Sequence, residues 1–297
     1  MKIMDIYRRF VPEKIKMRFH YWKQDFLARN FMRKLFNYYE KKQLTEDEEQ
    51  VINYLKKNKT IPVIPYDFTS EYKRENIEVY FDKDNGLKYV IFKGKKLYFK
   101  RSWSEDAIRR IFNFLLIEQD YRSPHYYVSD KILPEIQEVI ADVGAAEGIF
   151  TLDNIEKISK AFLFECDDEW IEALQCTFAP WNDKITIVKK FVSDNDSFPN
   201  ISLSSFFLNN EIDFIKIDVD GSESKLITGA RDLFNKTKKL KIVICTYHNQ
   251  DDHINFKKYF ESLHPQVLET SQGFMIFRED QNQKPPFLRR GVLRIKL

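Results

Sequence analysis

The stretch VIADVGAAEGIFT, residues 139–151, decides the fold of this chain. Its apolar residues lead into Asp142, and a short turn follows with Gly144 and Gly148 at its two ends. Apolar residues at helical spacing begin directly after the turn. This order predicts a strand, a tight turn and a helix, which is the arrangement that brings a nucleotide-like ligand to the start of a helix.

A second acid follows at the spacing expected for a nucleoside site. Glu165 lies 21 residues after Gly144 and ends an apolar strand over residues 161–164. A carboxylate at this spacing typically accepts hydrogen bonds from ribose hydroxyls. A dinucleotide fingerprint needs three glycines at fixed offsets, but Ala146 takes the middle position and Gly148 comes one residue early. Close approach of a pyrophosphate is therefore disfavoured.

S-adenosylmethionine fits this pattern better, because it carries a nucleoside, a sulfonium and an ammonium group but no phosphate. We assign the cofactor contacts to five residues, namely Asp142 and Gly144 at the methionine end, Gly148 at the helix start, Glu165 at the ribose and Asp194 beside the adenine. An ordinary strand, turn and helix without a ligand is the alternative for residues 139–151 taken alone.

Two more predicted strands end in polar residues. Residues 215–223 run from an apolar strand into Asp218 and Asp220, and residues 240–248 end in an aromatic residue and His248. Strands that alternate with helices indicate right-handed crossovers and a parallel α/β sheet that is buried on both faces. Ligands of such sheets bind beyond the carboxyl ends of the strands, so we expect these side chains to converge on one cleft.

Three blocks of the C-terminal half resemble the FkbM-type methyltransferases. They are residues 142–148, 164–165 and 213–223, the last closed by residues 227–230. The resemblance extends over roughly residues 121–280, and the blocks occur in the family's order. It implies a class I methyltransferase (Rossmann-like) sheet and, as in many members, O-methylation of sugars or polyketides. Asp220 departs from the family pattern, which usually has glutamate before this glycine.

Methyl transfer to a hydroxyl group would be helped by a general base. We expect His248 to be that base, because the intrinsic pKa of histidine suits neutral pH; a histidine bonded to a backbone carbonyl is the alternative. Asp218 or Asp220 could orient the base, act as the base or bind a divalent cation. A divalent metal is therefore possible, but we predict none. His125 precedes the first strand of the sheet and could line the cofactor cleft.

The chain is expected to have two parts. Residues 1–120 form a helical and β-meander extension, where we expect acceptor or partner recognition, and residues 121–297 form the methyltransferase domain. Within the extension, residues 77–99 predict three strands joined by tight turns, and a helix follows. Near the C-terminal end, residues 267–277 predict a hairpin that supplies the antiparallel last strand of the class I sheet.

The composition indicates a cytoplasmic protein. The 297 residues show no signal-peptide pattern and no apolar run of membrane-spanning length. Three cysteines lack metal-ligand spacing and are read as reduced thiols. Residues 1–42 hold twelve Lys and Arg but four Asp and Glu among many aromatic residues. This segment could contact a membrane surface peripherally or bind a protein, whereas no nucleic-acid recognition motif is present. We favour the alternative, a helical extension with a solvated basic face that packs on its own domain or on a second copy in a homo-oligomer.

Together these patterns predict an S-adenosylmethionine-dependent O-methyltransferase. The acceptor is expected to be a sugar hydroxyl in polysaccharide or glycoconjugate synthesis, and this part of the prediction rests on the family resemblance alone. One alternative is a non-catalytic, methyltransferase-like binding module that uses the basic N-terminal segment. Another is a nicotinamide-dependent oxidoreductase, which would need the missing middle glycine.

Overall fold

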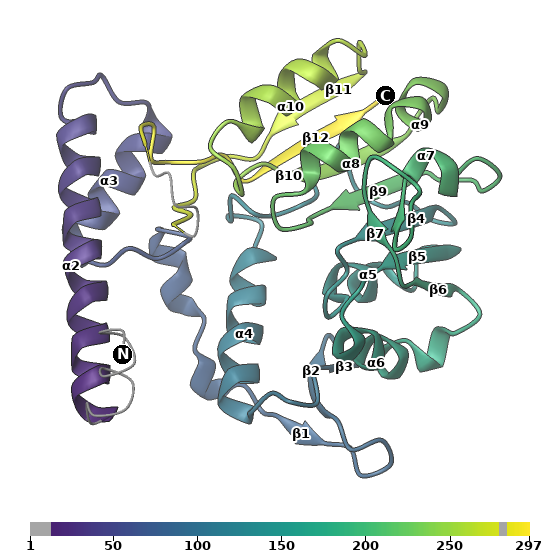
Figure 1. The fold of residues 1–297 in the computed structure, drawn as a ribbon, viewed down its shortest axis with the longest axis horizontal. Coiled ribbons are helices and arrows are strands. Elements are labelled where there is room, and N and C mark those ends of the chain that lie inside the picture. The colour runs from purple at the N-terminus through teal and green to yellow at the C-terminus, as the bar shows by residue number, and fades with distance from the viewer. Residues whose placement is uncertain (1–12, 279–283) are drawn as a thin grey trace, which may run out of the picture.

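The computed structural model describes the backbone of residues 13–278 and 284–297, and the side chains from residue 26 onward within those ranges (Figure 1). In this part of the chain seven strands form one sheet with the order β11-β12-β10-β9-β4-β5-β6. The strands are β4 (Val139–Val143), β5 (Lys160–Phe164), β6 (Ile185–Val188), β9 (Phe214–Ile217), β10 (Lys241–Cys245), β11 (Val267–Thr270) and β12 (Val292–Lys296). β12 runs antiparallel to both of its neighbours, β10 and β11, and the other strand pairs of this sheet are parallel. The predicted class I methyltransferase sheet is confirmed.

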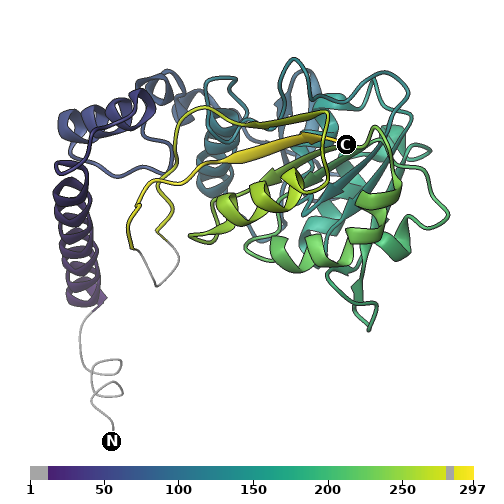
Figure 2. The same ribbon diagram turned by 90° about the horizontal axis from the view of Figure 1, so that it is seen from above.

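Helices cover both faces of the sheet, which explains why its central strands are nearly continuous apolar runs. One face packs against α4 (Glu105–Glu118), α5 (Ile149–Asn154) and α6 (Asp168–Thr177). The other face packs against α7 (Leu203–Phe206), α8 (Glu223–Gly229), α9 (Arg231–Lys236) and α10 (Asp252–Glu261). Figures 1 and 2 show these helices on opposite sides of the strands. The short elements η3 (Ala179–Trp181), β7 (Phe191–Val192) and β8 (Asn200–Ile201) lie between β5 and β9 in the sequence.

The N-terminal extension contains the predicted meander and two long helices. Its elements are α2 (Glu13–Tyr39), α3 (Glu46–Asn58), η1 (Asp67–Glu71), η2 (Arg74–Asn76), β1 (Tyr80–Phe81), β2 (Lys88–Phe92) and β3 (Lys95–Tyr98). The three strands pair antiparallel in sequence order, so the meander is confirmed. Both views show α2 and α3 at one side of the molecule, away from the large sheet.

The meander and α4 share a hydrophobic core with the large sheet. Phe99 and Phe112 belong to the same buried cluster as Ile140 of β4 and Phe150 of α5. In addition, the backbone N–H of Tyr98 donates a 3.0 Å hydrogen bond to the hydroxyl of Thr177 at the end of α6. A domain boundary at residue 120 stays a prediction, and this core runs across it.

The predicted hairpin over residues 267–277 is wrong. β11 pairs with β12 rather than with the segment after it, and Met275 makes an isolated bridge with Arg289 instead. The antiparallel last strand is therefore the C-terminal segment, Val292–Lys296, which lies between β10 and β11. Its first four residues are buried, so the central position gives this strand contacts on both faces.

The basic N-terminal segment lies largely outside the described side chains. Its described part packs inside the molecule, since Phe31 and Leu35 share a buried cluster with Phe287. Contact of residues 1–42 with a membrane surface or a protein stays a prediction. Among the residues that the structure describes, none of the helices combines the length and the apolar character that crossing a membrane requires.

Candidate active site

A cleft of about 770 Å³ opens at the carboxyl edge of the large sheet. It is lined by residues that follow five different strands, among them Gly144, Glu165, Asp194, Asp218, Asp220 and Tyr247. The topology thus brings together the predicted ribose acid, the predicted adenine neighbour and the two acids after β9. Parallel strands end at the same edge, and this common edge is the physical reason for the convergence.

The turn after β4 lies against the loop after β9. Gly144 has a φ of 75°, and a Cβ atom built on it would lie 1.8 Å from the backbone oxygen of Asp218. Only glycine allows this approach of the two backbones. The Nζ of Lys216 donates a 2.6 Å hydrogen bond to the carbonyl oxygen of Gly144 and so holds the turn in place.

Gly148 has a different surrounding from Gly144. It is the N-cap of α5 with a φ of 81°, and a Cβ atom there would meet the side chains of Leu174 and Phe178 at 2.7–2.8 Å. The residue lies at the helix start, as predicted, but it is not among the residues that line the cleft. Close packing against Leu174 of α6 and Phe178 explains why glycine is needed at this position.

Glu165 is held at the cleft wall by three backbone donors. Its Oε2 accepts a hydrogen bond from the N–H of Ala146 at 2.9 Å, and its Oε1 accepts from Cys166 at 2.7 Å and Asp167 at 2.9 Å. An ionised carboxylate offers about four acceptor positions, so acceptor capacity remains on the cleft side. This arrangement suits a carboxylate that accepts a hydrogen bond from a ribose hydroxyl.

Asp142 is not in the cleft, which differs from the prediction that it contacts the methionine end directly. Its side chain is fully buried. Its Oδ1 lies 3.0 Å from the Nζ of Lys216, and its Oδ2 accepts a 2.8 Å hydrogen bond from the hydroxyl of Thr151. A carboxylate inside a sheet needs such a cation and such a donor. Asp142 therefore acts on the cleft through Lys216, which anchors the turn at Gly144.

Asp194 also lines the cleft. Its Oδ1 accepts hydrogen bonds from the hydroxyl of Ser193 and the amide of Asn195. A Cβ atom at Gly229 of α8 would lie 2.0 Å from the backbone oxygen of Ser193, so close packing against α8 sets the position of this wall. The contact of Asp194 with adenine stays a prediction.

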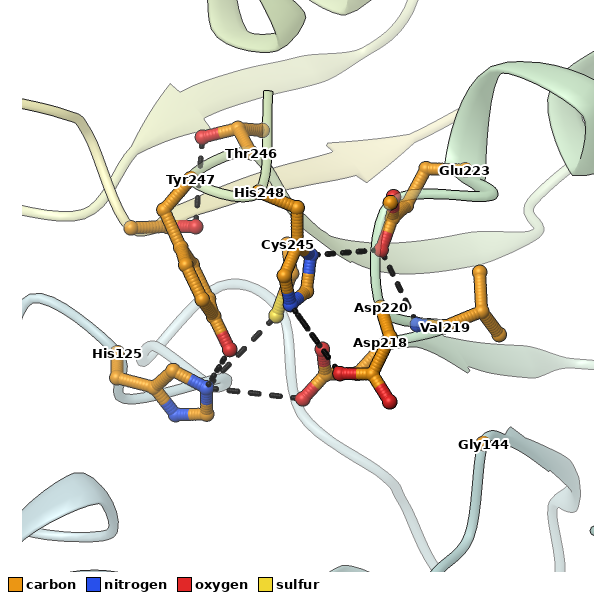
Figure 3. Close-up of polar contacts among 12 residues, drawn as sticks. His125, Gly144, Asp218, Val219, Asp220, Glu223, Cys245, Thr246, Tyr247 and His248 are labelled. Carbon is orange, nitrogen blue, oxygen red and sulfur yellow. Dashed lines mark hydrogen bonds and ion pairs between the residues drawn. The ribbon is translucent and has the colours of Figure 1, made fainter. Parts of the chain in front are cut away.

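Asp218 lies between two histidines (Figure 3). Its Oδ1 is 3.6 Å from the Nε2 of His248, and its Oδ2 is 3.7 Å from the Nε2 of His125. Oδ2 also accepts a 2.7 Å hydrogen bond from the hydroxyl of Tyr127. Burial alone would raise the pKa of Asp218, but the hydrogen bond and charge of His125 and the charge of Lys216 outweigh burial and hold the pKa well below its usual range.

His248 is oriented by a buried acid. Its Nδ1 lies 2.9 Å from the Oε1 of Glu223, whose side chain is fully buried and also accepts from the N–H of Val219. Its Nε2 faces Asp218 and, at 3.7 Å, the Oδ1 of Asp220. Burial would lower the pKa of His248, but Glu223 and Asp218 outweigh it and raise the pKa. The imidazole is buried and lies beside the two cleft acids.

The three residues predicted to be catalytic are thus adjacent. Asp220 adopts a left-handed backbone with a φ of 49° and extends a fully exposed side chain into the cleft. Two groups of described residues could hold a metal ion: Asp218 with Glu223 and His248, and Asp218 with His125 and Cys245. Because Glu223 and His248 already contact each other, we keep the prediction of no metal.

Sequence reasoning missed several residues of this site. Lys100 of the extension and Trp170 of α6 line the cleft, with the Lys100 Nζ 4.8 Å from the centre of the indole ring. Glu118, the last residue of α4, lies 3.8 Å from His125. No local pattern around Lys100 or Glu118 distinguishes them from surface charges, because only the packing of the extension brings Lys100 to the cleft and Glu118 to His125.

A sheet with this strand order, a glycine turn after β4 and acids at the ends of β5 and β9 defines a class I methyltransferase fold. Residues 142–276 match the model of the methyltransferase FkbM domain, so this part of the chain is similar to that methyltransferase family. No curated protein sequence matches the chain.

Several solved structures are similar to this chain. An FkbM methyltransferase from Methylobacillus flagellatus KT shares 20% identity and has a TM-score of 0.42, with 65% of this chain and 60% of that chain covered. A putative RNA methyltransferase from Pyrococcus horikoshii shares 13% identity with a TM-score of 0.36, covering 54% of this chain and 74% of that one. A putative methyltransferase from Streptococcus mutans, solved in complex with SAH, shares 11% identity with a TM-score of 0.37, covering 62% and 97%.

Proposed function

We propose that this protein is an S-adenosylmethionine-dependent O-methyltransferase that acts on a sugar hydroxyl. The observation that carries the proposal is the shared cleft, which is lined by Glu165, Asp194, Asp218 and Asp220, with His248 beside the last two. A cofactor acid and a base would thus face the same space. The family resemblance supports the sugar as acceptor.

The residues present fit S-adenosylmethionine by their chemistry. Glu165 offers carboxylate oxygens for a ribose diol, and Trp170 and Phe191 offer aromatic surface beside it. The left-handed turn at Gly144 leaves no side chain on that side of the cleft. The cleft acids also suit a ligand that carries positive charge and no phosphate. Bound there, S-adenosylmethionine would supply a methyl group on a sulfonium, which is an electrophilic carbon.

The chain's own residues would align the acceptor and hold its proton. Asp218 and Asp220 can accept hydrogen bonds from a sugar hydroxyl that enters between them. The neutral Nε2 of His248 would take the hydroxyl proton as the oxygen forms its bond to the methyl carbon and the bond from carbon to sulfur breaks. Glu223 keeps the imidazole in place and stabilises the resulting cation. Alignment and exclusion of water supply the remaining rate enhancement.

The first test is a calorimetric titration of the purified protein with S-adenosylhomocysteine and, separately, with NAD. We expect binding of the first and none of the second. Glu165→Ala should weaken binding of S-adenosylhomocysteine by about 10- to 150-fold, because a lost hydrogen bond to a charged group costs about 1.5–3 kcal/mol. Asp153→Ala, which removes an exposed acid that pairs with Lys93 outside the cleft, is the matched control.

The outcomes separate the alternatives. Binding of NAD alone would favour an oxidoreductase, and binding of neither would favour a non-catalytic module. Normal binding by a folded Glu165→Ala protein would refute the ribose assignment. A protein that binds S-adenosylhomocysteine should then be offered monosaccharides, nucleotide sugars and oligosaccharides with S-adenosylmethionine, and mass spectrometry should detect a gain of one methyl group. Failure with every sugar, together with methylation of a non-sugar hydroxyl, would refute the acceptor class.

A further inference from the structure

Five side chains, alternately acids and histidines, lie in series behind the cleft. Glu118 lies 3.8 Å from His125, which lies 3.7 Å from Asp218. Asp218 lies 3.6 Å from His248, which lies 2.9 Å from Glu223. Three acids therefore enclose two histidines, and Asp218 at the centre is shared by both rings. Figure 3 shows both rings beside this carboxylate, His125 facing one oxygen and His248 the other.

We propose that His125 is a positioning residue that holds one oxygen of Asp218 as a cation and thereby limits the negative charge that His248 experiences. This inference rests on the proposed function, because it explains how His248 is kept competent as a base. His125 does not line the cleft and touches neither ligand. Its effect on the reaction is transmitted through Asp218.

The surroundings of His125 favour its protonated form. The side chain is 2% exposed, and its Nε2 faces Glu118 and Asp218 together. A proton is favoured on the nitrogen that faces the two carboxyl groups, and negative charge on them favours a proton on the other nitrogen as well. Burial raises the pKa of Glu118, so Asp218 is the stronger of the two anions. Burial alone would lower the pKa of His125, but Glu118 and Asp218 outweigh burial and raise it. The other groups near the ring are Tyr127, Lys216, Cys245 and Tyr247.

His248 is surrounded by acids from several elements. Those that act on it are Glu223 of α8, Asp218 and Asp220 after β9, and Asp252 of α10. Each of these charges stabilises the imidazolium and so makes His248 a base only at higher pH. A cation on the far oxygen of Asp218 offsets part of this effect. Without a cation at His125, the negative charge of Asp218 would be less compensated and would raise the pKa of His248 further.

The size of the effect follows from Coulomb's law. A unit charge that lies two contacts away, in a surrounding with an effective dielectric constant of about 20, shifts a pKa by roughly one unit. His125→Gln is the informative change, because glutamine keeps an N–H donor near Asp218 but carries no charge. We therefore expect the titration midpoint of His248 to rise by about one pH unit in His125→Gln.

Histidine NMR measures this midpoint without any knowledge of the acceptor. The chain has five histidines, so imidazole ¹H–¹⁵N spectra of the full-length protein can be assigned by single substitutions. In the wild type we expect His125 to give an imidazolium signal at pH 7. His253→Gln is the matched control, since this ring on α10 contacts Thr270 and lies outside the series. It should leave the midpoint of His248 unchanged.

Two results would overturn the inference. One is a neutral His125 at pH 7 in the wild type, which needs no variant and does not depend on the folding of His125→Gln. The other is an unchanged midpoint of His248 in a folded His125→Gln protein, which would leave His125 a purely structural role. Binding of S-adenosylhomocysteine is measured on the same samples. If the wild type does not bind S-adenosylhomocysteine, the proposed function is refuted. If binding is normal but the titration midpoint of His248 does not shift in His125→Gln, only the role of His125 is refuted.

Discussion

Replacement of Lys216 by methionine tests how the floor of the cleft is built. Lys216 is 5% exposed, and its Nζ lies 3.0 Å from the Oδ1 of Asp142 and 2.6 Å from the carbonyl oxygen of Gly144. Methionine fills a similar volume without charge, so the change would leave Asp142 ionised and unpaired inside the sheet. Removal of one partner of a buried ion pair costs about 3–5 kcal/mol. A typical domain is stable by about 5–15 kcal/mol, so Lys216→Met should lose much of its stability.

Two further variants separate charge from packing. Asp142→Asn combined with Lys216→Met removes both charges, and we expect it to be clearly more stable than Lys216→Met alone. Thr151→Val removes only the hydroxyl that donates to Asp142, so it should cost about 1.5–3 kcal/mol.

The assay is equilibrium unfolding in urea, followed by circular dichroism, with calorimetric titration of S-adenosylhomocysteine on the folded variants. Lys216→Met should also bind this ligand more weakly, because the turn at Gly144 loses its donor. The reasoning would be refuted if Lys216→Met cost less than Thr151→Val. It would also be refuted if the double variant were no more stable than the single one.

Two other predictions concern the glycine turn and the pH dependence. Gly144→Ala and Gly148→Ala introduce similar left-handed backbone strain of about 1–2 kcal/mol. Only Gly144→Ala drives a Cβ atom into a backbone oxygen, that of Asp218, so we expect this variant alone to abolish binding of S-adenosylhomocysteine. Equal binding by the two variants would contradict this expectation. Because the pKa of His248 is raised in the folded state, its contact with Glu223 contributes its full stabilisation below about pH 6.5. This stabilisation is lost as the pH rises through the folded-state pKa. Turnover should rise over the same pH range, because the neutral form of His248 is the base. Unfolding and initial rates measured across pH 5–9 check both trends, and a rate that falls as His248 loses its proton would rule out its role as base.

The parallel sheet and its cleft could be predicted because each signal is local. The run over residues 139–151 contains its own strand, turn and helix start, and the acids at 165, 218 and 220 each follow a strand directly. Parallel strands place such residues at one edge, so no knowledge of side-chain contacts was needed.

The role of Asp142 could not be predicted, because it depends on strand register. Asp142 and Lys216 are direct partners across β4 and β9, although they are far apart in the sequence. The sequence shows an acid near a strand end, but it does not show which residue of the neighbouring strand lies beside it. The same limit explains the wrong hairpin, since the local turn after Thr270 suggested pairing with residues 274–277, while β11 pairs with β12.

The acid and base residues behind the cleft combine both parts of the chain. Glu118 ends a helix of the extension, His125 lies in the segment that follows, and Asp218, Glu223 and His248 belong to the sheet and its loops. The extension also shares a buried hydrophobic cluster with β4 and α5. Because burial strengthens every charge interaction in the series, this packing contributes to the pKa of His248 as well as to stability. The extension is therefore part of the candidate active site, beyond the acceptor recognition that the sequence suggested for it.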